Sequence, residues 1–188
     1  MTPAASRART RWPHGIERSA RPIASARIAS VTRRLLDAST LCAISTVSPG
    51  SRAHVNTAYF AWSPELELVW LSEPHARHSR NVRANASVAV AVYDSSQTWG
   101  EADRGIQLFG SAREESAAAP PDAASIYANR FPRYADGGFG AYRFYRLRPQ
   151  RVKLFDERSL GAGVFVTASV DRRGRMRWQR TEIYRADS

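Results

Sequence analysis

Five short segments of strand-type composition follow one another at regular spacing between residues 41 and 112, and this rhythm limits the fold more than any other feature. The segments are Leu41–Val47, Ala53–Trp62, Glu67–Ser72, Val88–Tyr93 and Gly105–Ala112. They are rich in Val, Thr, Tyr, Phe and Trp, which are enriched in strands, and short connections between strands favour antiparallel pairing. The sequence therefore predicts a mainly β protein, an antiparallel barrel or sandwich with a few helices.

Turn residues separate the first three of these segments. Ser48-Pro49-Gly50 follows the first and Ser63-Pro64-Glu65 follows the second, and such residues favour tight turns. We expect the first three strands to form a meander. Residues 141–155 show partial alternation and are predicted to return as a further strand, whereas 164–170 and 176–179 are weaker strand candidates.

Three stretches have helical signals. Apolar residues recur at helical spacing between Ile28 and Leu36, which predicts an amphipathic helix that covers one end of the sheet. Residues 76–85 suit a short basic helix that crosses a barrel end, and residues 121–131 are bracketed by Pro121 and Pro132, which favour a helix start and stop.

The net charge of +11 is concentrated near the two ends of the chain. Residues 1–34 carry eight arginines against one acidic residue, and 171–188 carry six against three, whereas 35–170 are nearly balanced. Residues 1–22 are rich in Arg, Ala, Pro and Ser without apolar periodicity, which predicts a disordered Arg-rich arm. Nucleic-acid binding through this arm is an alternative function, but the nearly neutral remainder makes it the less favoured one.

No run approaches the roughly 18 apolar residues of a membrane span, and residues 1–22 lack the apolar core of a signal peptide. We therefore expect a soluble, cytoplasmic protein without a membrane partner. Cys42 lies in an apolar run and is predicted to be a buried core residue. His75 and His78 lack a third ligand at suitable spacing, so no metal site is predicted.

The most informative stretch runs from Leu71 to Val82, where a strand ends at Ser72 and a basic helix begins. A helix N-terminus offers unpaired backbone N–H groups, and the planar fork of Arg77 can hold two phosphate oxygens. The residues themselves allow two interpretations, an anion site or an ordinary solvated helix face.

Three motifs in order decide between them: Asn56–Tyr59, Ser72–His78 and Gly105–Gly110. Together with Asn85 and the apolar strand after it, they resemble the FMN-binding split barrels of the pyridoxamine 5′-phosphate oxidase-like superfamily, and most closely a small, poorly characterised branch. The resemblance covers about residues 28–155. It implies an antiparallel split β-barrel of the FMN-binding type, with FMN held at a homodimer interface.

The resemblance also implies roles for individual residues. His54 to Tyr59 would run along the flavin ring, Ser72 would contact the ribityl or phosphate portion, Arg77 and His78 would grip the phosphate, and Gln107 would come from the opposite strand or the other subunit. The implied cofactor-binding residues are His54, Asn56, Thr57, Ala58, Tyr59, Leu71, Ser72, Arg77, His78, Ser79 and Gln107. No side chain is identified as catalytic.

Two departures from the family pattern bear on function. His78 stands where the well-known oxidases have Lys, which weakens the expected grip on phosphate near neutral pH. Tyr127 and Arg130 are one residue too close for the substrate pair of those oxidases, so pyridoxamine phosphate is not the expected substrate.

The resulting prediction is an FMN-dependent oxidoreductase that acts as a homodimer on an unidentified small organic substrate. Alternatives are a deazaflavin coenzyme or haem in the same groove, or a flavin-binding protein without turnover. The predicted organisation is a disordered arm over 1–22, an FMN-binding split-barrel domain over 23–160, and a C-terminal segment over 161–188 packed on the barrel or the dimer interface.

Overall fold

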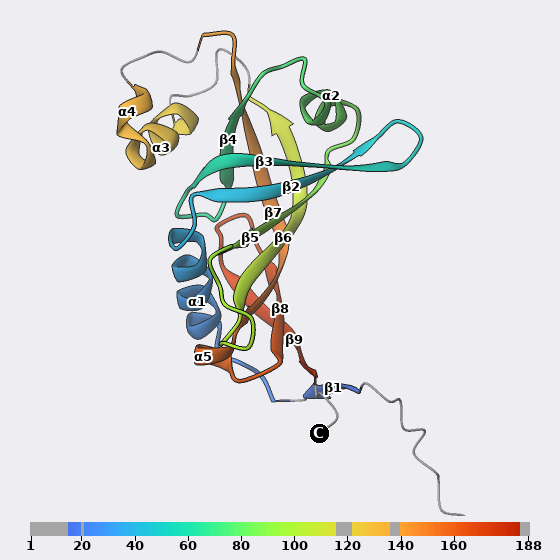
Figure 1. Ribbon diagram of the computed structural model, residues 1–188, viewed down its shortest axis with the longest axis vertical. Helices are drawn as coiled ribbons and strands as arrows, with labels where there is room; N and C mark the ends of the chain where they lie inside the picture. Colours follow the sequence, from blue (N-terminus) through green and yellow to red (C-terminus); the bar gives the residue numbers. More distant parts are fainter. Residues whose placement is uncertain (1–14, 20, 116–121, 136–139, 185–188) are drawn as a thin grey trace, which may run out of the picture.

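The computed structural model describes residues 15–19, 21–115, 122–135 and 140–184, which form one antiparallel sheet with helices around it (Figure 1). The strands are β1 (Ile16–Ser19), β2 (Leu41–Ser48), β3 (Arg52–Trp62), β4 (Leu68–Ser72), β5 (Ser87–Tyr93), β6 (Arg104–Glu114), β7 (Arg143–Asp156), β8 (Val164–Val170) and β9 (Met176–Tyr184). The helices are α1 (Ser25–Asp37), α2 (Arg77–Ala84), α3 (Asp122–Arg130), α4 (Pro132–Ala135) and α5 (Glu157–Leu160).

The sheet closes on itself through the long strand β7. Its order is β1-β9-β8-β7-β4-β3-β2-β5-β6, and β6 also pairs with β7. Residues 143–147 of β7 pair with β4 and residues 151–155 pair with β8, while β6 runs along the other edge. One long strand therefore serves both the barrel and the extension formed by β8, β9 and β1, and the predicted antiparallel split barrel is confirmed.

The barrel core consists of the inward-facing residues of the strands and one face of α1. Helix α1 buries Ile28, Val31, Leu35 and Leu36, and contacts β5, β6 and β9. The apolar residues whose spacing predicted this helix thus form the face that packs on the core.

Helix α2 lies apart from α1, beside the upper end of β4 and the projecting β2–β3 hairpin (Figure 1). It packs mainly on β2, with further contacts to β6 and β3. The predicted meander β2-β3-β4 is confirmed, and Gly50 and Ser51 turn the first hairpin with φ of 82° and 61°.

The two ends of the chain differ from the sequence-based expectation. Ile16–Ser19, inside the range predicted to be disordered, forms β1 and pairs with Thr181–Tyr184 of β9, whereas residues 1–14 and 20 lie outside the described residues. Strand β9 continues to Tyr184, five residues beyond the expected end. β8 pairs with β7, so residues 164–184 continue the sheet of the barrel.

Candidate functional site

A group of polar side chains gathers where β4 ends and α2 begins. Ser72, the last residue of β4, is buried, and its Oγ lies 2.5 Å from Nε2 of His78. Ser79 is fully buried and donates a hydrogen bond from Oγ to the carbonyl oxygen of Glu73 (2.8 Å). Ser79 therefore holds the turn in place and is not exposed to a ligand. We call Ser72, Arg77, His78 and His54 the phosphate cluster, after the role that the sequence resemblance implies for Arg77 and His78.

His54 enters this cluster from β3. Its ring stacks on that of His78, with centroids 6.4 Å apart and planes inclined by 4°. Burial and, less strongly, the neighbouring His54 lower the pKa of His78 from its ordinary 6.5, while Glu73 acts in the opposite direction. His78 is therefore a neutral imidazole near pH 7.

Strand β3 has one open edge beside the phosphate cluster. Residues 52–59 pair with β2, but the ladder to β4 is confined to Phe60–Trp62. Within the described residues, the edge of residues 53–59 that faces away from β2 has no backbone hydrogen-bond partner. Since backbone groups on such an edge remain free to bond, it offers alternating donors and acceptors to a planar polar ligand.

The side chains of β3 alternate between two faces. His54, Asn56 and Ala58 are partly buried, whereas Val55, Thr57 and Tyr59 are exposed. Asn56 and Thr57, which the resemblance placed together near a flavin ring, therefore project from opposite faces.

Other predicted site residues lie apart from the phosphate cluster. The exposed Tyr59 ring meets Phe131 edge to face at 5.8 Å, and Leu71 pairs in register with Phe144 of β7. Gln107 is exposed on β6 and belongs to a cross-strand row that reaches it from Thr57 through Ala43 and Ala91. The structure thus brings Ser72, His78 and His54 together, with Arg77 beside His78 at the start of α2. It places Thr57 and Gln107 on the outer face of the same sheet.

Beyond Arg77 a pocket of about 460 Å³ opens between α2 and the β2–β3 turn. Its lining consists of Ser48, Pro49, Gly50, Arg52, Arg77, Arg80 and Asn81. We call it the arginine pocket. Sequence reasoning missed Arg52 and Arg80, although both follow from periodicity: Arg52 is two residues before His54 on a strand, and Arg80 is three after Arg77 on a helix.

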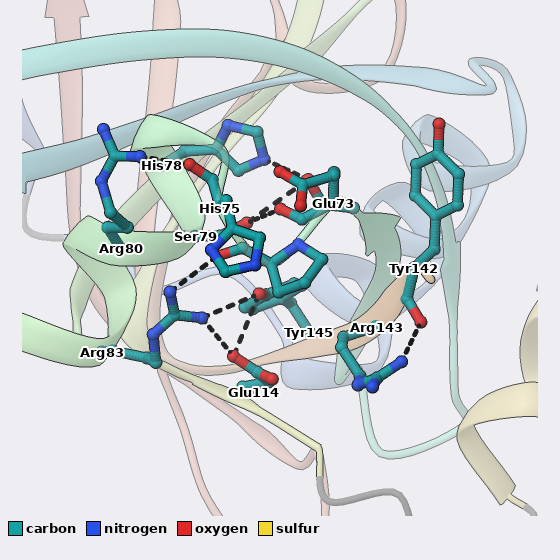
Figure 2. A network of polar contacts seen from close by, with 12 residues as sticks. Glu73, His75, His78, Ser79, Arg80, Arg83, Glu114, Tyr142, Arg143 and Tyr145 are labelled. Atoms are coloured by element: carbon teal, nitrogen blue, oxygen red, sulfur yellow. Dashed lines mark hydrogen bonds and ion pairs between the residues drawn. The ribbon is translucent and has the colours of Figure 1, made fainter. Parts of the chain in front are cut away.

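A second network anchors the C-terminal half of α2 (Figure 2). Arg83 donates to Oε2 of Glu114 on β6 (2.6 Å) and to the carbonyl oxygen of Pro74, and the hydroxyl of Tyr145 donates to the same carboxylate (3.1 Å). Burial raises the pKa of Tyr145, which stays protonated. Because these contacts join α2 to β6 and β7, they fix the helix that carries Arg77 and His78.

Among the described residues, no cluster of three or more His, Cys, Asp or Glu side chains could hold a metal ion. In the same part of the chain, no helix combines the length and apolarity needed to span a bilayer.

Solved structures with similar folds come from several bacteria. A protein of unknown function from Agrobacterium tumefaciens superposes with a TM-score of 0.61 at 21% identity, over 68% of this chain and 56% of that one. A haem-binding protein from Mycobacterium smegmatis superposes with a TM-score of 0.63 at 15% identity, over 83% of this chain and 62% of that one. A FAD-binding protein from Mesorhizobium loti superposes with a TM-score of 0.54 at 19% identity, over 73% of this chain and 95% of that one. The chain therefore spans less than two thirds of the first two proteins, and these similarities concern the fold.

Comparison at the level of sequence identifies the family. No curated protein sequence matches the chain. Residues 29–156, which include the phosphate cluster, the arginine pocket and all strands from β2 to β7, match the family described as pyridoxamine 5′-phosphate oxidase. The chain belongs to the pyridoxamine 5′-phosphate oxidase family.

Proposed function

We propose that the chain binds the FMN moiety of a flavin coenzyme between the open edge of β3 and the start of α2, and uses it to oxidise or reduce a small organic substrate. The observation that carries this proposal is the phosphate cluster itself. A hydroxyl group and two imidazoles from three elements converge there, Arg77 begins α2 next to one of these imidazoles, and the other comes from a strand with a free edge. This combination suits a ligand with a phosphate at one end and a planar polar ring at the other.

The residues present fit such a ligand. Oδ1 of Asn56 is buried and has no hydrogen-bond partner in the described part of the chain, and a buried unpaired acceptor is costly unless a ligand or water satisfies it. The N–H and carbonyl groups of a flavin ring would bond to this amide and to the open edge of β3. Arg77, which makes no ion pair with any described residue, would hold the phosphate with Ser72 and His78.

The redox chemistry would come from the isoalloxazine ring of the bound coenzyme, and the chain would supply binding, orientation and electrostatics. Arg77 and Ser72 would fix the phosphate end, and the edge of β3 would set the ring orientation. Hydride transfer depends chiefly on such positioning, so the proposal needs no acid–base pair from the chain.

We further propose that the protein acts as a homodimer through the outer face of β3, β2, β5 and β6. Leu41, Val55, Tyr59 and Tyr93 are large hydrophobic side chains with 46–61% of their surface exposed. Between them the row from Thr57 to Gln107 passes through Ala43 and Ala91, whose small side chains allow close approach of another sheet. Two copies would thereby bring Gln107 of one subunit towards β3 of the other.

Haem is a second candidate for the same site. His78 is neutral near pH 7 and stacks on His54, and neutral imidazole is the form that ligates iron. A haem-binding protein is also among the structures with this fold.

An absorbance spectrum tests both candidates. The full chain is incubated separately with FMN and haem, dialysed, and compared with Arg77→Ala and with Arg33→Ala, whose side chain is exposed on α1. Retained flavin bands that Arg77→Ala loses and Arg33→Ala keeps would support the proposal. Retention of haem alone, with a Soret band that His78→Ala abolishes, would identify haem as the ligand in place of a flavin.

Turnover is tested next. The flavin bands should bleach when NADPH reduces the bound flavin, and they should return when a candidate substrate reoxidises it.

A further inference from the structure

The arginine pocket gathers positive charge without any acidic counterpart. Three guanidinium groups, from Arg52 on β3 and from Arg77 and Arg80 on α2, share a lining that contains no carboxylate. All three side chains are exposed. Like charges that converge in this way repel one another, and an anion of high charge removes the repulsion.

Elsewhere in the chain many arginines are paired with acids. Arg83, one turn after Arg80 on the same helix, binds Glu114 at 2.6 Å, and Arg146 and Arg148 both bind Glu67. Arg52 and Arg77 have no ion pair with a described residue, and Arg80 donates to the carbonyl oxygen of His75. The three arginines of the pocket are thus left with donors that a ligand could use.

The pocket adjoins the phosphate cluster, and Arg77 borders both. Arg52 is two residues before His54 on the same face of β3, which separates their Cα atoms by about 7 Å along the strand. Arg77, Arg80 and Asn81 are spaced three and four residues apart and share one face of α2. This spacing of about 7 Å is similar to the length of a diphosphate group together with the bond that follows it. A second phosphate linked to one in the phosphate cluster would therefore reach the arginine pocket.

We propose that the arginine pocket binds the second phosphate of a diphosphate-linked flavin, so that the preferred coenzyme is the dinucleotide FAD and not FMN alone. This inference rests on the proposed function, because it assumes that the first phosphate lies in the phosphate cluster. The guanidinium fork of Arg52 and that of Arg80 bind the outer phosphate, and Arg77 bridges the two phosphates. A volume of about 460 Å³ lies within the roughly 300–1,000 Å³ of pockets that hold small organic ligands.

Binding titrations with FAD, FMN, riboflavin and ADP test the inference on the full chain. Flavin binding is followed by fluorescence quenching and ADP binding by calorimetry, for the natural chain, Arg52→Ala/Arg80→Ala, and Arg33→Ala as the control. A charge-assisted hydrogen bond is worth about 1.5–3 kcal/mol, or about tenfold or more in affinity. We expect FAD to bind at least about tenfold more tightly than FMN, and the double variant to lose that advantage while its FMN affinity changes less than threefold.

Each other outcome is decisive. Equal affinities for FMN and FAD, or equal weakening of both by the double variant, would refute the dinucleotide preference and leave the proposed function intact. Binding of ADP through Arg52 and Arg80 with no binding of any flavin would overturn the proposed function and the FAD preference with it, and would show that the pocket binds a diphosphate from another ligand. No binding of ADP or flavin would overturn both.

A control for folding accompanies the titrations. Arg52 and Arg80 are exposed, so the double variant should keep the circular dichroism spectrum and melting temperature of the natural chain. Should it fail to fold, Arg52→Lys/Arg80→Lys retains the charge but lacks the fork, and it must still weaken FAD more than FMN for the inference to stand.

Discussion

His78 is the residue on which the chemistry of the phosphate cluster depends most. It hydrogen-bonds to the buried Ser72 and stacks on His54, and burial lowers its pKa. A neutral imidazole suits the packed cluster, whereas a bound phosphate favours the protonated form. Protonation of His78 therefore acts in opposite directions on folding and on anion binding.

The first prediction concerns the stability of the ligand-free protein. The pKa of His78 is lower in the folded chain than its ordinary 6.5, so the unfolded chain binds the proton more readily. The stabilisation from a neutral His78 is complete above pH 6.5 and is lost as the pH falls through the folded pKa. Melting temperatures measured between pH 7.5 and 5 should fall less steeply for His78→Gln, and identical slopes would contradict this.

The second prediction concerns the affinity for phosphate-bearing flavin. Because the phosphate favours protonated His78, binding takes up a proton, and the affinity for FMN should rise as the pH is lowered from 8 to 6.5, by less than tenfold per pH unit. Riboflavin lacks the phosphate and should show no such rise. Titrations of both ligands across this range check the difference, and a rise that persists in His78→Gln would assign the proton to another group.

At the scale of elements, the strands could be predicted well because each alternates or is continuously apolar. β8 has the expected bounds of 164–170, and β7 begins at Arg143 where the sequence suggested 141. β1 escaped prediction because its partner in the sheet is β9, far away in sequence. The end of β9 was placed too early because Arg177, Gln179 and Arg180 hide its alternation.

The candidate site could be predicted only in part. Ser72, Arg77 and His78 follow one another along the chain, so a motif is enough to find them. The distribution of Asn56 and Thr57 over two faces follows from strand alternation, which the motif comparison did not take into account. Strand alternation places Arg52 on the same face as His54, but its position beside Arg77 and Arg80 depends on the β2–β3 hairpin lying against α2, which is a tertiary contact.

The glycines of the Gly105–Gly110 motif have a structural explanation in the pairing of β6 with β7. A β-bulge lies between Phe109 and Gly110. A Cβ atom on Gly110 would lie 2.0 Å from the carbonyl oxygen of Arg148 and 2.8 Å from Cα of Pro149. Both are backbone atoms of β7, so the clash cannot be relieved by a side-chain rotation.

The third prediction follows from this contact. Gly110→Ala should destabilise the fold by about 3 kcal/mol, as overpacking against fixed backbone does. Gly15→Ala is the matched control, because nothing lies within 4 Å of a Cβ atom there. Urea denaturation of the two variants measures the difference, and a Gly110→Ala protein as stable as the control would show that the bulge rearranges freely.

At the scale of the whole molecule, the outer face of β3, β2, β5 and β6 exposes several large hydrophobic side chains of the described residues. α1 seals the core from one side and α2 covers the hairpin end of the barrel. In the single chain, 61% of the surface of Val55 and 51% of that of Tyr59 is exposed. In the proposed dimer this face does two things, since it joins the subunits and brings Gln107 to the flavin site of the partner.

The fourth prediction separates these two roles from folding. Val55 is exposed in the single chain, so Val55→Glu should leave the melting temperature of a monomer unchanged, but it would bury a carboxylate in the dimer, which is strongly unfavourable without a partner charge. Light scattering should then show a monomer, and flavin affinity should fall with the loss of the second subunit. Ile16→Glu on β1, where Ile16 is 53% exposed, is the control and should remain dimeric. A Val55→Glu protein that stays dimeric would move the interface to another face, and a monomer with unchanged flavin affinity would show that one chain holds the complete site.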